Sequence, residues 1–182
     1  MPAVTYSVIN SAQPTTAAPV KQPTGTAIRT MVQLAPLASG FPIRIIEVNA
    51  SFDASSPATP GEVEVFACTG AATMSTAYAA ADIMAYGSRL DTPANTAGVS
   101  GTPLSLGTAL SAFATAAVTE GTVANYRLFD AQQISPTNQY VKQFPQGREP
   151  QLGGNSATQE FLRVRMTFGA SVNAYIVVIF EV

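Results

Sequence analysis

The stretch Ile43-Arg44-Ile45-Ile46-Glu47-Val48-Asn49-Ala50-Ser51-Phe52 decides the fold class. From its fourth residue onward, apolar side chains alternate with polar ones. The apolar positions are Ile46, Val48, Ala50 and Phe52, and the polar positions are Glu47, Asn49 and Ser51. A period of two in a segment rich in β-branched residues predicts a half-buried β-strand, with the apolar set facing a core.

The same alternation recurs along the chain, between segments rich in proline and glycine. Further strands are predicted over residues 28–34, 62–68, 123–130, 140–144, 159–168 and 172–181. The last is apolar on both faces from Ala174 to Phe180, which is typical of a central strand covered on two sides. One segment, Thr73 to Tyr86, is rich in alanine and is predicted to be a helix capped by Gly87.

These strands predict an all-β protein, a jelly-roll-like antiparallel β-sandwich with an extended N-terminal arm. In a sandwich, two sheets pack face to face and bury alternate residues of every strand. A chain of 182 residues suits the eight strands of a jelly roll better than an immunoglobulin domain of about 100 residues. No repeat of fixed period is visible, which argues against a propeller or a solenoid.

Residues 1–26 are expected to form the arm, and residues 27–182 the β-sandwich domain. Prolines occur throughout the arm, at Pro2, Pro14, Pro19 and Pro23. Each removes an amide donor and keeps the preceding residue extended, so the segment is not helical. The best apolar anchors of the arm, on its own chain or on a neighbour, are Tyr6, Val8 and Ile9. Its single charge is Lys21, a further candidate contact.

Charge is scarce in this chain. Charged residues make up 11% of it, the net charge is −2, and residues 92–119 carry no charge at all. Ordinary soluble domains carry about 25% charged residues. Because interface cores are depleted of charge, the composition predicts a component of an assembly, with a neutral monomer as the alternative. The nearly balanced charge argues against nucleic-acid binding and against a polybasic membrane surface.

The residue inventory also excludes several kinds of chemistry. The chain has no histidine, so Ser-His-Asp catalysis, Cys-His catalysis and histidine-ligated metals are excluded. We expect no catalytic, cofactor-binding or metal-binding site. Cys68 is the only cysteine, so no intramolecular disulfide can form, and we expect a small core residue and synthesis in a reducing cytoplasm. The first twenty residues lack the charged and apolar regions of a signal peptide, and no apolar stretch is long enough for a membrane span.

Two arginines and a pair of glutamates have alternative interpretations. Arg163 and Arg165 lie on one face of a predicted strand. They can grip a carboxylate of a neighbouring subunit, or pair within the sheet with glutamates such as Glu160 or Glu181. Glu62 and Glu64 also share a strand face, where paired carboxylates can bind Ca²⁺ or act as acid and base. A solvated face or a salt bridge to arginine is the favoured interpretation of the two glutamates.

The loop Gln143-Phe144-Pro145-Gln146-Gly147-Arg148-Glu149-Pro150 is the remaining distinctive segment. Its two prolines restrict the backbone, and the adjacent Arg148 and Glu149 are expected to point to different partners. We interpret it as an ordered contact loop or, equally well, as a structural connection.

Three features together resemble a small virion protein of a tailed bacteriophage. These are the nearly uncharged Thr/Ala/Pro arm, the Phe144–Pro150 loop before Phe161-Leu162-Arg163-Val164-Arg165, and the apolar last strand ending in Phe180-Glu181-Val182. The resemblance is to head-decoration (cement) proteins and spans most of the chain. It implies a jelly-roll protein, often a homotrimer, made in the host cytoplasm. Such proteins bind the outside of an HK97-type shell and clamp neighbouring capsomers of the major capsid protein.

Two other function classes remain open on sequence grounds. A receptor- or carbohydrate-binding head of a phage fibre or spike requires exposed aromatic residues along a groove, and the chain has no tryptophan. A β-sandwich enzyme requires a catalytic constellation, which the sequence does not offer. The expected function is therefore structural and non-enzymatic.

Overall fold

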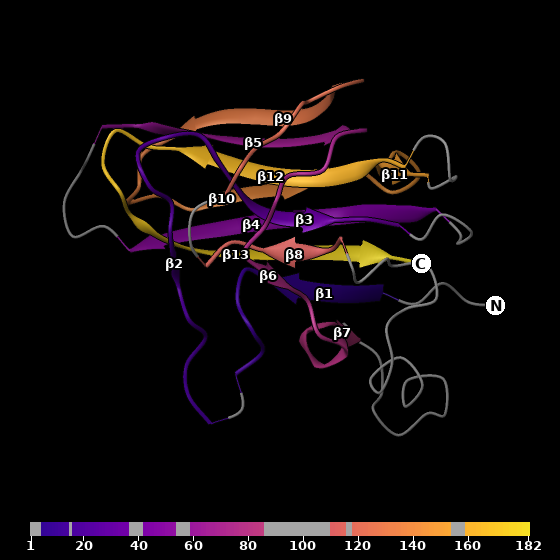
Figure 1. Ribbon diagram of the computed structural model, residues 1–182, viewed down its shortest axis with the longest axis horizontal. Helices are drawn as coiled ribbons and strands as arrows, with labels where there is room; N and C mark the ends of the chain where they lie inside the picture. Colours follow the sequence, from indigo (N-terminus) through magenta and orange to yellow (C-terminus); the bar gives the residue numbers. More distant parts are fainter. Residues whose placement is uncertain are drawn as a thin grey trace.

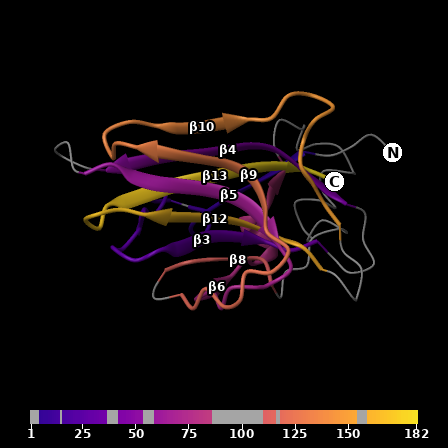
Figure 2. The same ribbon diagram turned by 90° about the horizontal axis from the view of Figure 1, so that it is seen from above.

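The computed structural model describes residues 5–14, 16–36, 42–53, 59–85, 110–115, 118–153 and 159–182. Two antiparallel sheets pack face to face, as the alternating pattern predicts (Figures 1 and 2). Sheet A has the order β10 (Tyr140–Gln143), β4 (Ile43–Asp53), β13 (Asn173–Glu181), β1 (Thr5–Ile9) and β7 (Met84–Ala85), with β2 (Gln22–Pro23) beside β13 and β11 (Gln151–Leu152) beside β4. Sheet B has the order β6 (Thr76–Ala77), β8 (Ala112–Phe113), β3 (Arg29–Leu34), β12 (Phe161–Thr167), β5 (Gly61–Cys68) and β9 (Arg127–Ile134).

The longer strands follow the jelly-roll connection pattern. Sheet A pairs them as β10-β4-β13-β1 and sheet B as β3-β12-β5-β9. All of these pairings are antiparallel. Neighbours in each sheet are therefore distant in sequence, and the chain crosses between the sheets as in two interleaved Greek keys.

The core lies between the inner faces of the two sheets. β13 contributes buried residues at alternate positions, namely Ala174, Ile176, Val178 and Phe180. β12 contributes Leu162, Val164 and Met166 from the opposite sheet. β13 is central in sheet A, as predicted, but Tyr175 and Val177 on its outer face are only half-buried. The predicted cover of its outer face is therefore partial over the described residues, since only Ile179 of that face is buried.

The strand that decides the fold class contains a bulge. Along β4, Glu47 pairs with Ile179 and Ile45 with Phe180, so Ile46 has no partner on β13. This extra residue reverses the alternation. Ile43, Ile45, Val48 and Ala50 are all buried, whereas Ile46 is half-buried. The prediction that Ile46 shares the inner face with Val48 is therefore wrong.

Two other local predictions need correction. The strand predicted over residues 123–130 begins at Arg127 and runs to Ile134. It starts later than predicted because the residues before it form hydrogen bonds with the segment that follows β5, where Thr69 N–H donates to Ala124 O. The segment 73–85 is not an α-helix: it contains β6, a 3₁₀ turn at Ala80–Asp82 and β7. There, pairing with neighbouring strands outweighs the helix propensity of alanine. Tyr86, Gly87 and residues 92–109 of the charge-free stretch lie outside the described residues.

The N-terminal segment is extended, as predicted, and it is part of sheet A. β1 lies between β13 and β7, and β2 adds to β13 further along. Tyr6, Val8 and Ile9 are 6%, 0% and 4% exposed. The boundary at residue 26 is therefore not a boundary of the sandwich. The three apolar residues anchor the segment on its own chain, which was one of the two alternatives.

Candidate interaction surface

Two limbs of the connection between β5 and β9 pack over part of the outer face of sheet B. The first limb starts at Thr69, directly after β5, and the second limb, residues 118–126, leads into β9. Thr69 N–H donates to Ala124 O at 2.9 Å, and Thr73 N–H to Thr119 O at 2.8 Å. A Cβ on Gly70 would lie 1.7 Å from Thr122 O, so the two limbs approach this closely only because residue 70 is glycine.

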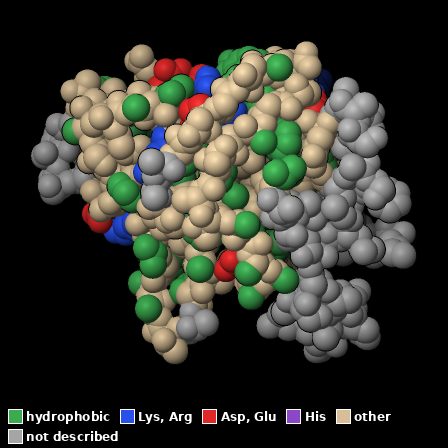
Figure 3. All heavy atoms as spheres, in the orientation of Figure 1, with side chains coloured by type: hydrophobic (Ala, Val, Ile, Leu, Met, Phe, Trp, Pro, Cys, Tyr) green, Lys and Arg blue, Asp and Glu red, His purple; other side chains and the backbone are tan. Residues whose placement is uncertain are grey.

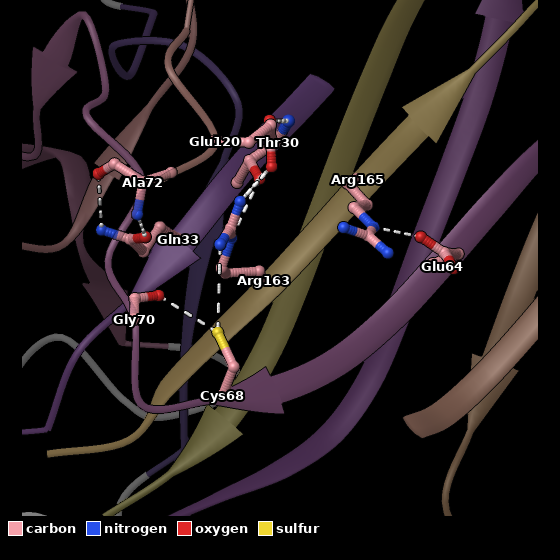
Figure 4. Close-up of polar contacts among 9 residues, drawn as sticks. All are labelled: Thr30, Gln33, Glu64, Cys68, Gly70, Ala72, Glu120, Arg163 and Arg165. Atoms are coloured by element: carbon pink, nitrogen blue, oxygen red, sulfur yellow. Dashed lines mark hydrogen bonds and ion pairs between the residues drawn. The ribbon is translucent and has the colours of Figure 1, made fainter. Parts of the chain in front are cut away.

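Arg163 is buried beneath this connection. Its side chain is 0% exposed and donates two hydrogen bonds to Thr30 Oγ1, at 3.0 and 2.8 Å. It forms an ion pair with Glu120, which in turn accepts a hydrogen bond from the Thr30 hydroxyl at 2.7 Å (Figure 4). The Phe66 ring lies 5.4 Å from the guanidinium carbon. Arg163 therefore cannot grip a neighbouring subunit in this conformation, and its partner is neither Glu160 nor Glu181.

Arg165 is also committed within the chain. It forms an ion pair with Glu64 on β5 and lies 4.6 Å from the centre of the Phe66 ring (Figure 4). Burial lowers the pKa of the Arg165 guanidinium, but the hydrogen bond to Glu64 and the charge of Glu64 together raise it by more. The net shift of this pKa is therefore upward. Glu64 thus forms a salt bridge to an arginine, which is the interpretation that the sequence favoured for it. For Arg165, the glutamates named as examples of partners were Glu160 and Glu181, and neither is its partner. Glu160 and Glu181 pair with Arg127 and Arg44 instead.

Polar side chains of β3 hold the same connection in place. Gln33 donates to Leu110 O at 2.8 Å and accepts from Ala72 N–H at 2.8 Å. Cys68 is buried and its thiol donates to Gly70 O at 3.1 Å, as a small core residue would. The Gln33 contacts join segments far apart in sequence, so sequence reasoning had no signal by which to find them.

The loop between β10 and β11 is a tight turn. Arg148 N–H donates to Pro145 O at 2.9 Å, and Gly147 has a φ of +80°, which favours glycine. The Glu149 carboxylate accepts from Gly147 N–H at 3.0 and 2.9 Å. Hydrogen bonds from the Glu149 and Gly147 amides lower the pKa of this carboxyl, and nearby Arg44 lowers it further. The Glu149 carboxylate thus stabilises the turn in which it lies, while the Arg148 side chain is exposed.

Residues 12–14 and 16–21 belong to a loop that projects from the body between β1 and β2, here called the projecting loop (Figures 1 and 3). Its base is held at both ends. Gln13 N–H donates to Asp82 Oδ1 at 2.9 Å, and Lys21 pairs with Asp53 at 2.7 Å. Apart from half-buried Gln13, its described residues are exposed, and Val20 is 61% exposed. Lys21 is thus a surface residue, but its charge is matched at the base of the loop.

Exposed large apolar residues lie at positions that the sequence did not single out as contact residues. They are Val20, Ile28, Met84, Leu110, Tyr126, Leu128 and Val141. Alternation shows which residues share a face of a strand. It does not show which face stays uncovered once the sheets pack, so these positions could not be read in advance.

A shallow groove of about 290 Å³ lies between the first limb of the β5–β9 connection, β8 and Gln33 of β3. Apart from Gln33, the residues that line it are small or apolar, namely Ala71, Ala72, Thr73, Met74, Ala77, Leu110 and Ala112.

No known family, curated protein or solved structure matches this chain. Over the described ranges, no three His, Cys, Asp or Glu residues cluster to hold a metal ion. A search of the same part of the chain finds no helix long and apolar enough to cross a membrane.

The surface that remains is suited to contact with protein. Of the eight predicted contact residues, Tyr6, Val8, Ile9 and Arg163 are buried, and Arg165 and Glu149 are engaged within the chain. Lys21 and Arg148 are exposed. Uncharged loop residues and single apolar side chains can bury area against a partner without the cost of desolvating a charge.

Proposed function

We propose that this chain is a non-enzymatic virion structural protein, a capsid decoration (cement) protein of a tailed bacteriophage. In this role copies of the chain associate, as a homotrimer, and bind the outside of the shell. They clamp neighbouring capsomers through contacts with the major capsid protein. The proposal extends the resemblance noted in the sequence and needs no cofactor, nucleic acid or membrane.

The projecting loop is the observation that carries the proposal. Its described residues from Ala12 to Val20 carry no charge, and both ends are fixed to the sandwich by Asp82 and Asp53. A loop whose base is held loses less conformational entropy on binding than a free tail. The loop therefore supports a clamp built of many uncharged contacts on a rigid jelly roll.

The first experiment replaces residues 14–20 with a Gly-Ser linker of equal length, which leaves Gln13 and Lys21 in place. Shells assembled without the chain are mixed with each variant and sedimented. We expect the wild-type chain to sediment with the shells and the linker variant to stay in the supernatant, while its β-sheet circular dichroism is unchanged. Full binding by the linker variant would show that the loop is not the clamp.

A point variant with a matched control sharpens this test. Val20→Asp places a charge on the loop, and Gln139→Asp places one on the exposed turn between β9 and β10. Desolvating one carboxylate in a contact costs at least about 1.4 kcal/mol, or a tenfold loss of affinity. We expect this loss for Val20→Asp and none for Gln139→Asp. Equal effects of both variants would count against a specific role of the loop.

The role itself is tested on intact particles. The chain should be present on the shell of purified virions in copies that match a lattice position, as imaging and mass measurement of the particles would show. Absence of the chain from virions, or glycan-array binding by the isolated protein, would favour the receptor-binding alternative instead.

A further inference from the structure

β9 is an edge strand, and no strand of the described residues pairs with its outer side. It pairs with β5 from Gly61–Ile134 to Ala67–Arg127, and it ends the strand order of sheet B. Figure 1 shows it along the upper rim of the molecule. No backbone hydrogen bond joins its other side to any described residue. A row of amide N–H and carbonyl groups therefore faces outward there.

This edge lacks several of the devices that protect sheet edges. Proline, charged side chains (above all lysine), inward-pointing charges, bulges and short length are the usual ones. β9 has eight residues, Arg127–Ile134, with neither proline nor lysine. It has a bulge, because Leu128 pairs with Phe66 and Asp130 with Val65, but residues 130–134 beyond the bulge pair regularly. By contrast, the edge strand of sheet A, β10, has four residues and includes Lys142.

The charge of Asp130 is already neutralised within the chain. Its carboxylate accepts hydrogen bonds from the Tyr140 hydroxyl at 2.9 Å and from Lys142 Nζ at 3.1 Å, both on β10. The rest of the regular segment, Ala131 to Ile134, is uncharged, and Ala131, Gln132 and Gln133 are exposed. Leu128, just before it, is 51% exposed. An added strand would therefore meet no unpaired charge along this segment.

We propose that β9 pairs antiparallel with β9 of a second copy of the chain, around a twofold axis at Ala131. In this register Asp130 faces Gln132 of the partner copy, so a carboxylate meets an amide donor. The same two groups already bond within one chain, where Gln132 Nε2 donates to Asp130 Oδ2 at 2.9 Å. This complementarity favours the same strand as occupant over an unrelated extended peptide.

The contact joins two copies of sheet B into one continuous sheet. The same surface is used on both sides, so the contact closes after two copies and leaves no free edge at β9. It goes beyond the proposed function, because it needs neither the shell nor the projecting loop. The twofold contact is isologous, whereas a homotrimer is held by heterologous contacts, so the two are separate interactions.

Lysine substitution tests the pairing. Ala131→Lys places two like charges beside the axis, whereas Gln143→Lys places a lysine on β10. The two sites are matched, because residue 131 pairs with Glu64 and residue 143 with Glu47. By light scattering over a concentration series, we expect Ala131→Lys to weaken self-association by at least about tenfold and Gln143→Lys to leave it unchanged.

Cysteine substitution tests the axis itself. Residues at a twofold between antiparallel strands have Cα atoms about 4.5–5.5 Å apart, which suits a disulfide. We expect Ala131→Cys to form a covalent dimer under mild oxidation and Gln143→Cys to stay single. Wild-type chains that remain single at about 200 μM, equal effects of both lysine variants, or an assembly that Ala131→Lys leaves intact would each overturn the proposal.

Discussion

At the residue scale, the buried pair of Arg163 and Glu120 is the most consequential finding. Sequence reasoning placed Arg163 and Arg165 on one strand face and considered pairing inside the sheet. It could not identify Glu120, because that residue is 43 positions away and reaches Arg163 only when the β5–β9 connection folds over sheet B. A buried charge without its partner is far more costly than an exposed one, so this pair locks the connection to the sheet.

Removal of the acid should therefore be costly. We expect Glu120→Gln to lower the free energy of unfolding by about 2–3 kcal/mol, because Arg163 is then buried without a counter-charge. Urea denaturation measures this change. The double variant Glu120→Gln/Arg163→Met should lose less than Glu120→Gln alone, since it leaves no buried charge. A double variant that loses the sum of the two single effects would contradict the account.

Two tyrosines should make the protein sensitive to alkali. Burial, then the charge of Asp82, raises the pKa of Tyr78 well above its ordinary value, and burial, then a hydrogen bond to Asp130, raises that of Tyr140. A folded pKa above the unfolded value of about 10 means that folding favours the neutral phenol. This stabilisation is fully present below pH about 10 and is lost as the pH rises through the folded pKa.

We therefore expect the free energy of unfolding to fall with increasing pH above about 10. In an ultraviolet titration, Tyr78 and Tyr140 should ionise only when the protein unfolds. Tyr140→Phe should make the free energy of unfolding fall less steeply with pH, by a slope that corresponds to at most one proton released on unfolding. Ionisation of every tyrosine near pH 10 in the folded protein would contradict this expectation.

At the element scale, Asn10 completes the edge of β13 where the N-terminal strand leaves it. The side chain is 0% exposed, donates to Ala174 O at 3.0 Å and accepts from Ile176 N–H at 2.9 Å. It thus continues the ladder between β1 and β2 while the backbone departs into the projecting loop. Nothing in the sequence around Asn10 signals this role, because both of its partners lie more than 160 residues away.

Asn10→Ala leaves a donor and an acceptor of β13 buried without partners. Each such group costs about 1–3 kcal/mol, so we expect a loss of about 2–6 kcal/mol in the free energy of unfolding, measured by urea denaturation. Ser7→Ala on β1 serves as the control and should change stability by less than about 0.5 kcal/mol. Equal stability of the two variants would show that the hydrogen bonds of the Asn10 side chain to β13 do not stabilise the fold.

Element prediction succeeded where alternation continued without interruption. β3, β5, β10, β12 and β13 lie within about two residues of their expected bounds. It failed at Ile46, where a bulge reverses the pattern, and over residues 73–85, where alanine favoured a helix. In both places, pairing with a distant strand decides the local conformation, and local propensity does not include it.

At the scale of the whole molecule, the low charge content has a measurable consequence for the proposed shell contact. The described residues from Ala12 to Val20 are uncharged, and the one ion pair at the base of the loop stays within the chain. Salt screens charged contacts but not apolar ones. We expect shell binding to change by less than about twofold between 50 and 500 mM salt in sedimentation assays. A steep loss with salt would indicate that exposed charges such as Arg148 provide the contact.

Alternation and composition alone were sufficient to determine that the chain is an antiparallel β-sandwich with a charge-poor surface, because a period of two buries one face of every strand. Only the tertiary structure decided that the N-terminal strand belongs to sheet A, that Arg163 is inside, and that the projecting loop and the β9 edge are exposed. Burial and exposure depend on which distant segments lie over a residue, and the chain specifies this only through the packing of the complete fold.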